Sequence, residues 1–318
     1  MLNRVGLGAV NRWTRVATTS SLLALVGSAW SCAGPEGVFM NTTPSAETSL
    51  NVMESEPAPE VVWTPSDIAP TANRNWASDP FVSPQGVSLR VPPARYFESS
   101  VEGRDLHYWV VGEGGETILL LGGKHGNERS SSELAYRFLE WVLQNPDQLE
   151  GRRLVIAPLV NPDGFARNTR ENAHLVDLNR NFPAKNWRAA DSLRGWQHRP
   201  GPHPRSEPET RFLLYLLNRF PADRVISLHG AASCVNWDGP AEDLAREMAT
   251  DCGLPPRASL GYPTPGSFGS YLGLDLEIPT ITLELTENKN IGKPFETYRR
   301  ALLTGILHPT TAPHRLSG

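Results

Sequence analysis

The sequence predicts an α/β fold, in which a single catalytic domain has a mixed β-sheet with helices on both faces. Short runs rich in Val, Ile and Leu alternate along the chain with amphipathic segments of helical period. The chain has 318 residues, of which 39% are hydrophobic and 20% are charged, so a globular core can form. Strands that alternate with helices indicate a largely parallel or mixed sheet covered on both faces.

Five apolar runs are predicted to be strands and four amphipathic segments are predicted to be helices. The strands are residues 106–111, 117–121, 154–159, 225–228 and 280–285. The helices are residues 131–143, 207–218, 240–250 and 295–307. Functional groups gather where the strands of such sheets end. Polar residues at these strand ends are therefore the first candidates for chemistry.

The composition excludes several classes of protein. The net charge of −4 provides no basic field that would recruit nucleic acid, so no nucleic-acid partner is predicted. Three cysteines are too few for a disulfide framework. A coiled coil and a polytopic membrane protein are also excluded. The length leaves either one large α/β domain or two domains as the interpretation of the chain.

Residues 1–32 have the pattern of an export signal. Three arginines and no acidic residue precede a mostly apolar stretch over 16–30, and small residues precede Cys32. The segment resembles a bacterial lipoprotein signal, whose cysteine is acylated after cleavage; an ordinary cleaved signal is the alternative. We therefore expect export to a bacterial envelope, either to the periplasm or to a membrane through acylated Cys32.

Residues 33–87 differ in composition from the rest of the chain. Seven acidic residues and eight prolines stand against one basic residue, Arg74. Such a segment cannot bury enough apolar surface to offset its ordering entropy. A disordered linker is predicted here, serving either as a tether or as a plain spacer. Residues 88–318 then form the catalytic domain.

Three residues at strand ends have the chemistry of a metal site. His125 and Glu128 lie three apart on a glycine-rich turn after the strand at 117–121, and His229 follows the strand at 225–228. Two histidines and one carboxylate form a catalytic zinc set that leaves a coordination position open for water. The spacing alone is weak evidence, because His174 and Asp177 repeat it elsewhere.

Glu284 is the candidate general base. It lies inside the apolar strand at 280–285. A buried carboxylate without a partner is costly, so Glu284 would need one, such as a zinc-bound water. The alternative is that Glu284 lies on a solvent-facing edge of its strand.

The order of the motifs resembles that of the M14 zinc carboxypeptidases, over about residues 103–307. The resemblance rests on six segments, which are residues 125–128, 161–164, 177–183, 206–210, 227–229 and 283–285. Residues 177–187 and 261–270 are similar to the murein peptide amidase subfamily. The resemblance implies a zinc-carboxypeptidase-like sheet and one Zn²⁺ per chain.

The resemblance also implies a role for each site residue. His125, Glu128 and His229 would bind zinc, and Glu284 would act as the base. Arg170 would stabilise the oxyanion, with Asp177 orienting His125 from behind. Asn179 and Arg180 would hold the substrate's terminal carboxylate, and Tyr262 would close over the substrate. Arg167 is the alternative candidate for the oxyanion residue, although the motif spacing favours Arg170. Tyr262 could instead be an ordinary packed aromatic.

The predicted activity is zinc-dependent hydrolysis of a peptide bond next to a residue with a free carboxylate. The resemblance implies the γ-D-glutamyl-meso-diaminopimelate bond of murein peptides. The alternatives are a general metallocarboxypeptidase, an acyl-amino-acid deacylase of the succinylglutamate desuccinylase or aspartoacylase type, and a non-catalytic peptidoglycan-binding lipoprotein. The sequence leaves open whether Cys234 and Cys252 form a disulfide.

Overall fold

The computed structural model describes residues 81–82, 88–89, 94–190, 198–230, 232–286 and 295–309. All of them belong to one compact unit, Val61–Gly318. The predicted export signal with Cys32, and all of the predicted linker except residues 81–82, lie outside the described residues. Within the described residues, no helix combines the length and apolar character needed to cross a membrane.

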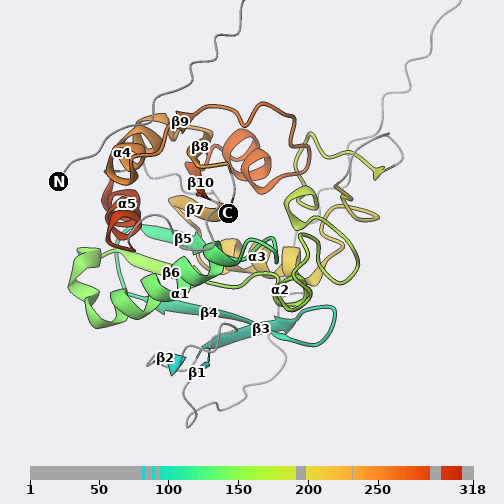
Figure 1. Cartoon of the computed structure of the whole chain (residues 1–318), viewed down its shortest axis with the longest axis horizontal. Coiled ribbons are helices and arrows are strands. Elements are labelled where there is room, and N and C mark those ends of the chain that lie inside the picture. Colours follow the sequence, from blue (N-terminus) through green and yellow to red (C-terminus); the bar gives the residue numbers. More distant parts are fainter. Residues whose placement is uncertain are drawn as a thin grey trace, which may run out of the picture. The chain divides into compact units, whose positions relative to one another are not determined.

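An eight-stranded mixed sheet forms the centre of this unit, in the order β3-β4-β6-β5-β7-β10-β8-β9 (Figure 1). Strand β5 pairs in parallel with β6 and β7, and β7 pairs in parallel with β10, whereas β8 runs antiparallel to β10. The strands are β3 (Arg95–Ser99), β4 (Asp105–Val111), β5 (Thr117–Leu121), β6 (Arg153–Ala157), β7 (Arg224–Gly230), β8 (Cys234–Asp238), β9 (Pro256–Arg257) and β10 (Thr280–Leu285). Separately, β1 (Phe81–Val82), within the predicted linker, pairs with β2 (Ser88–Leu89).

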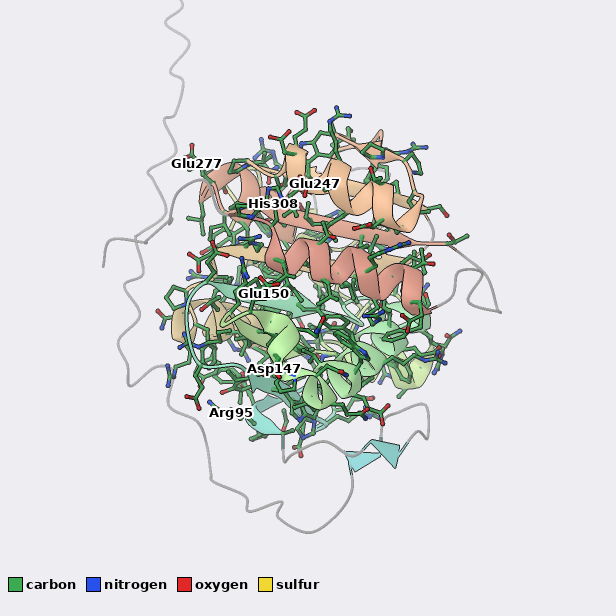
Figure 2. All side chains as sticks on the ribbon, turned by 90° about the vertical axis from the view of Figure 1, so that its left-hand side faces the viewer. Arg95, Asp147, Glu150, Glu247, Glu277 and His308 are labelled. Atoms are coloured by element: carbon green, nitrogen blue, oxygen red, sulfur yellow. The ribbon has the colours of Figure 1, made fainter. Side chains whose placement is uncertain are left out.

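Helices pack on both faces of the sheet, so the predicted fold class is confirmed. One core contains residues of α1 (Arg129–Gln144), α4 (Glu242–Cys252) and α5 (Phe295–Leu307). The other contains residues of α3 (Pro208–Arg219) and of the π-helix η5 (Ser270–Asp275). Shorter elements are α2 (Pro162–Arg167), η2 (Pro146–Leu149) and η3 (Leu178–Arg180). Figure 2 shows His308 and Glu247 on the α4–α5 face, where His308 Nδ1 is 3.1 Å from Glu247 Oε2.

The two cores explain why the central strands are continuous apolar runs. In β5, Ile118 and Leu120 belong to one core, whereas Leu119 and Leu121 belong to the other. All five residues of β5 are buried, as expected for a parallel strand covered on both faces. Truncating Leu119 to Ala should cost roughly 2–5 kcal/mol of folding free energy.

Strand β8 was not predicted, because it has no continuous apolar run. Its side chains alternate, and Asn236 and Asp238 face a cavity while Val235 belongs to the core. In the described structure Cys234 and Cys252 are both buried and no disulfide joins them, so the pairing that the sequence left open is not formed.

Candidate metal centre and active site

His125 and Glu128 lie on the turn that connects β5 to α1. The turn packs closely on the backbone of α2, because a Cβ added to Gly126 would be 1.9 Å from the carbonyl carbon of Gly164. Only glycine permits this approach. The turn brings His125 Nδ1 to 2.7 Å from Glu128 Oε1. The predicted pair therefore converges locally.

His229 completes the group from the neighbouring strand. Strands β5 and β7 are parallel and paired, so their carboxyl ends meet at one edge of the sheet. His229 Nδ1 is 3.1 Å from His125 Nδ1 and 3.0 Å from Glu128 Oε2. One donor atom from each of the three residues lies within 4.8 Å of the others. Two imidazoles and a carboxylate at this spacing fit a zinc ion.

The charge states of His229 and Glu128 suit a metal ligand set. Burial lowers the pKa of His229 to about 4, which leaves its imidazole neutral at neutral pH. Although burial disfavours its charged form, the nearby histidines hold the pKa of Glu128 well below its usual value. Metal ions bind neutral imidazole and ionised carboxylate.

Asp177 lies behind His125. Its Oδ1 is 3.1 Å from His125 Nε2, and its Oδ2 accepts a hydrogen bond of 2.9 Å from Arg170 Nε. A proton on Nε2 leaves Nδ1 of His125 free to bind an ion. Although burial opposes ionisation, His125 and Arg170 hold the pKa of Asp177 well below its usual value. His198, which the sequence prediction missed, places Nδ1 at 3.3 Å from Asp177 Oδ2.

Glu284 lies one strand away from His229. In the parallel ladder of β10 and β7, Glu284 is directly opposite His229. Its side chain is 7% exposed, and Oε2 accepts a long hydrogen bond of 3.4 Å from the Ala232 N–H. Burial, together with the negative charge of Glu128, raises the pKa of Glu284 to about 7. Glu284 is therefore not on a solvent-facing strand edge.

Asn179 and Arg180 lie side by side in η3 on another wall of the site. Asp177 caps η3, because its Oδ1 accepts a hydrogen bond of 2.9 Å from the Asn179 N–H. Arg180 is 1% exposed, and its guanidinium donates a hydrogen bond of 2.6 Å to the Asn179 carbonyl. Tyr262 is 51% exposed, so it is not an ordinary packed aromatic.

Most of these residues surround one cavity of about 1010 Å³. Eight of the nine predicted site residues line it, and Asp177 lies behind His125. The sequence prediction missed the polar residues of the wall formed by β8, β10 and residues 264–267. They are Asn236, Asp238, Thr264, Ser267 and Thr282.

Residues that pair across β7, β10 and β8 form three successive rows along this wall. Glu284 pairs with Cys234, Thr282 pairs with Asn236, and Thr280 pairs with Asp238. Alternate residues of a strand share one face, so these rows lie at increasing distance from the metal group. Asp238 is about 13 Å along the strands from the row of Glu284, at roughly 3.3 Å per residue.

A mixed α/β sheet with a His-Glu-His group at its strand ends defines a class of metal-dependent hydrolases. Comparison with known families agrees, because the family described as zinc carboxypeptidase matches residues 96–251. The chain belongs to this M14 zinc carboxypeptidase family, and it is a hydrolase.

The relatives include murein peptide amidases. Murein peptide amidase A of Escherichia coli K12 is 38% identical over 181 residues, which cover 53% of this chain and 71% of that protein. The Vibrio campbellii protein of the same name is 30% identical over 222 residues, covering 64% and 86%. The crystal structure of murein-tripeptide amidase from E. coli O157 matches with a TM-score of 0.57 and 32% identity, covering 69% and 94%.

Proposed function

We propose that this protein is a zinc-dependent amidase that removes a terminal residue bearing a free carboxylate, with the γ-D-glutamyl-meso-diaminopimelate bond of murein peptides as its substrate. One observation carries the proposal. A metal-ligand group, a buried carboxylate and an Asn-Arg pair line the same cavity. The names of the similar amidases agree with this substrate.

His125, Glu128 and His229 would hold the zinc ion. When bound, zinc supplies Lewis acidity toward the substrate carbonyl and lowers the pKa of a coordinated water. Asp177 would keep His125 in the ligating tautomer through the Nε2 contact. Glu128 would remain ionised, because Arg170 and the Gly230 N–H also donate hydrogen bonds to it.

Glu284 would be the general base. Its raised pKa, about 7, places its proton exchange near neutral pH, where acid–base catalysis is most effective. Glu284 would take a proton from the attacking water and later donate it to the leaving amine. Arg170 would stabilise the negative charge that develops on the carbonyl oxygen, because its side chain faces the cavity and its charge is fixed by Asp177.

Asn179 and Arg180 would bind the terminal carboxylate of the substrate. A guanidinium and an amide can together donate several hydrogen bonds to one carboxylate. A clamp of this kind favours cleavage of the last bond of a peptide over internal bonds. Tyr262, exposed at the cavity, would close over the bound residue.

The polar wall of the cavity would receive the side chain of the terminal residue. Asn236, Ser267 and Thr282 line its length and Asp238 lies at the far row, so apolar side chains would bury polar groups without compensation. Burial raises the pKa of Asp238, and an ammonium group of the substrate would stabilise its charge. Meso-diaminopimelate carries such a group on a long side chain, which supports it as the terminal residue over residues with apolar side chains.

An activity panel tests the proposal. Zinc-loaded protein would be incubated with L-Ala-γ-D-Glu-meso-diaminopimelate and with ordinary peptides that end in Lys, Leu or Phe, and the products would be separated by chromatography. We expect release of diaminopimelate as the preferred reaction. Cleavage of ordinary C-terminal peptides with an intact murein tripeptide would instead identify a general carboxypeptidase. Cleavage of acyl-amino acids alone would identify a deacylase.

We also propose that the protein works in the bacterial envelope. The arginines and apolar residues of segment 1–32 support export, and Cys32 supports lipidation. Cell fractionation of the full chain, with metabolic labelling by a radioactive fatty acid, tests both points. A Cys32→Ser variant should lose the label while remaining exported.

A further inference from the structure

Lys124, next to the metal ligand His125, has an unusual environment. Its side chain is 1% exposed, so its ammonium group is removed from water. Burial of an uncompensated ammonium is costly. Within the described residues, no carboxylate oxygen lies within ion-pair distance of Nζ, and its one hydrogen bond is a long one of 3.4 Å to Asn179 Oδ1. Its charge must therefore be stabilised by groups other than an ion-pair partner.

Two aromatic rings partly compensate the buried charge. Lys124 Nζ lies 4.3 Å from the ring centroid of Phe268 and 5.8 Å from that of Phe182. Such contacts stabilise a cation and hold it in place. They fix Nζ directly behind Asn179, on the protein side of the cavity wall.

Lys124 and the Phe268 N–H together determine which way the Asn179 amide faces. Its Oδ1 accepts hydrogen bonds from Lys124 Nζ and from the Phe268 N–H, at 3.4 and 3.0 Å. Both partners are donors, so the oxygen must point toward them and the Nδ2 group must be on the other side of the amide. Asn179 lines the cavity, where Nδ2 can then donate to a substrate.

The carboxylates nearest to Lys124 are paired with other residues, so a bound anion could add to the stabilisation of its charge. The carboxylates of Asp177 and Glu128 already contact His125 and Arg170. Asp177 and Glu128 favour the cationic form of Lys124 from a distance, whereas the like charge of Arg180 opposes it. An anion that binds at Asn179 and Arg180 would relieve this repulsion.

We propose that Lys124 is a positioning residue for the terminal carboxylate of the substrate: it orients the Asn179 amide and adds a second positive charge behind the Asn179–Arg180 clamp. This inference rests on the proposed function, because it assumes that the clamp binds a carboxylate. It adds a residue that does not itself line the cavity.

The experiment measures binding rather than turnover. Zinc-loaded Glu284→Gln protein would be titrated calorimetrically with L-Ala-γ-D-Glu-meso-diaminopimelate and with the same tripeptide carrying a carboxamide in place of the clamp-bound carboxylate. Lys124→Met in this background removes the charge and the donor but keeps an apolar stem between the rings. We expect binding of the free acid to weaken about ten- to a hundredfold and binding of the amide to change little.

Two further variants complete the design. Lys124→Arg keeps a cation and donors and should retain the preference for the free acid. Lys185→Met removes an exposed lysine outside the cavity and should bind as the parent does. If Lys124→Met does not fold, Lys124→Gln, which is neutral and too short to replace the ammonium, tests the same point.

The outcomes separate the two proposals. A parent protein that prefers the free acid, together with Lys124→Met that keeps this preference, overturns the role of Lys124 and leaves the proposed function intact. Equal binding of the acid and the amide by the parent overturns the clamp itself. Equal weakening of both ligands in Lys124→Met indicates a merely structural role and also overturns the inference.

Discussion

Glu284 lies directly opposite His229 in the parallel ladder between β10 and β7. Both side chains line the same cavity, so the register of two central strands fixes the candidate base next to a candidate metal ligand. A slip of one residue would turn Glu284 to the other face of the sheet. The chemistry of the site thus depends on the pairing of the core.

Glu284→Gln should nearly abolish activity without loss of metal. The amide cannot accept a proton from water, so we expect kcat to fall about 10²–10⁴-fold. Zinc should remain, because Glu284 is not part of the His-Glu-His group. Steady-state kinetics and metal analysis check both points, with Glu247→Gln on the exposed surface of α4 as the control. Turnover at the parent rate would exclude Glu284 as the base.

His229→Ala should lose zinc, whereas His174→Ala should keep it. His174 has the same sequence spacing to Asp177 as His125 has to Glu128, but its side chain is 58% exposed and pairs with Glu207 at 2.8 Å. It is also absent from the three-residue ligand group. Metal analysis after desalting distinguishes the two variants. Zinc retained in His229→Ala would mean that the ligand set is wrong.

The candidate metal group and the candidate base could be picked out from the sequence, because each follows or lies within a mostly apolar run. The predicted bounds of β5 and β10 are those of the structure, since both strands are mostly buried and consist largely of Ile, Leu and Thr. His229 could be predicted in the same way, because it follows the apolar run at 225–228. Each of these residues is positioned by its own strand.

The wall that contains Asn236 and Asp238 could not be predicted, because it depends on the register between β8 and β10. Strand β8 has only five residues and lacks the continuous apolar run that marked the predicted strands, and its pattern does not indicate its register against β10. The burial of Lys124 is a second example. It requires Phe182 and Phe268, which come from segments that are distant in the sequence.

Asp238→Asn should change the preference for the terminal side chain. Loss of the carboxylate at the far row should raise KM for substrates ending in meso-diaminopimelate or Lys by about tenfold, as expected for loss of one charge-assisted hydrogen bond. Peptides ending in a neutral residue should be affected much less, because their side chains do not pair with Asp238. Kinetics on matched peptides measure the ratio. An unchanged ratio would place the recognition of the side chain elsewhere in the cavity.

Glu209→Gln should make the fold less sensitive to pH. Glu209 is fully buried, and burial raises its pKa from 4.5 to about 7 even though Asn172 donates a hydrogen bond to it. The nearby charges of Asp163 and Glu207 act in the same direction as burial.

The folded state therefore binds more protons at Glu209 than the unfolded state does between about pH 4.5 and 7. Its contribution to stability is fully present below pH 4.5 and is lost as the pH rises through 7, by at most about 3 kcal/mol. Gln cannot ionise, so the variant should gain stability over the parent as the pH rises from 4.5 to 8. Urea unfolding of the metal-free proteins at several pH values measures this difference without interference from zinc release. A difference that stays constant across the range would show that Glu209 does not titrate there.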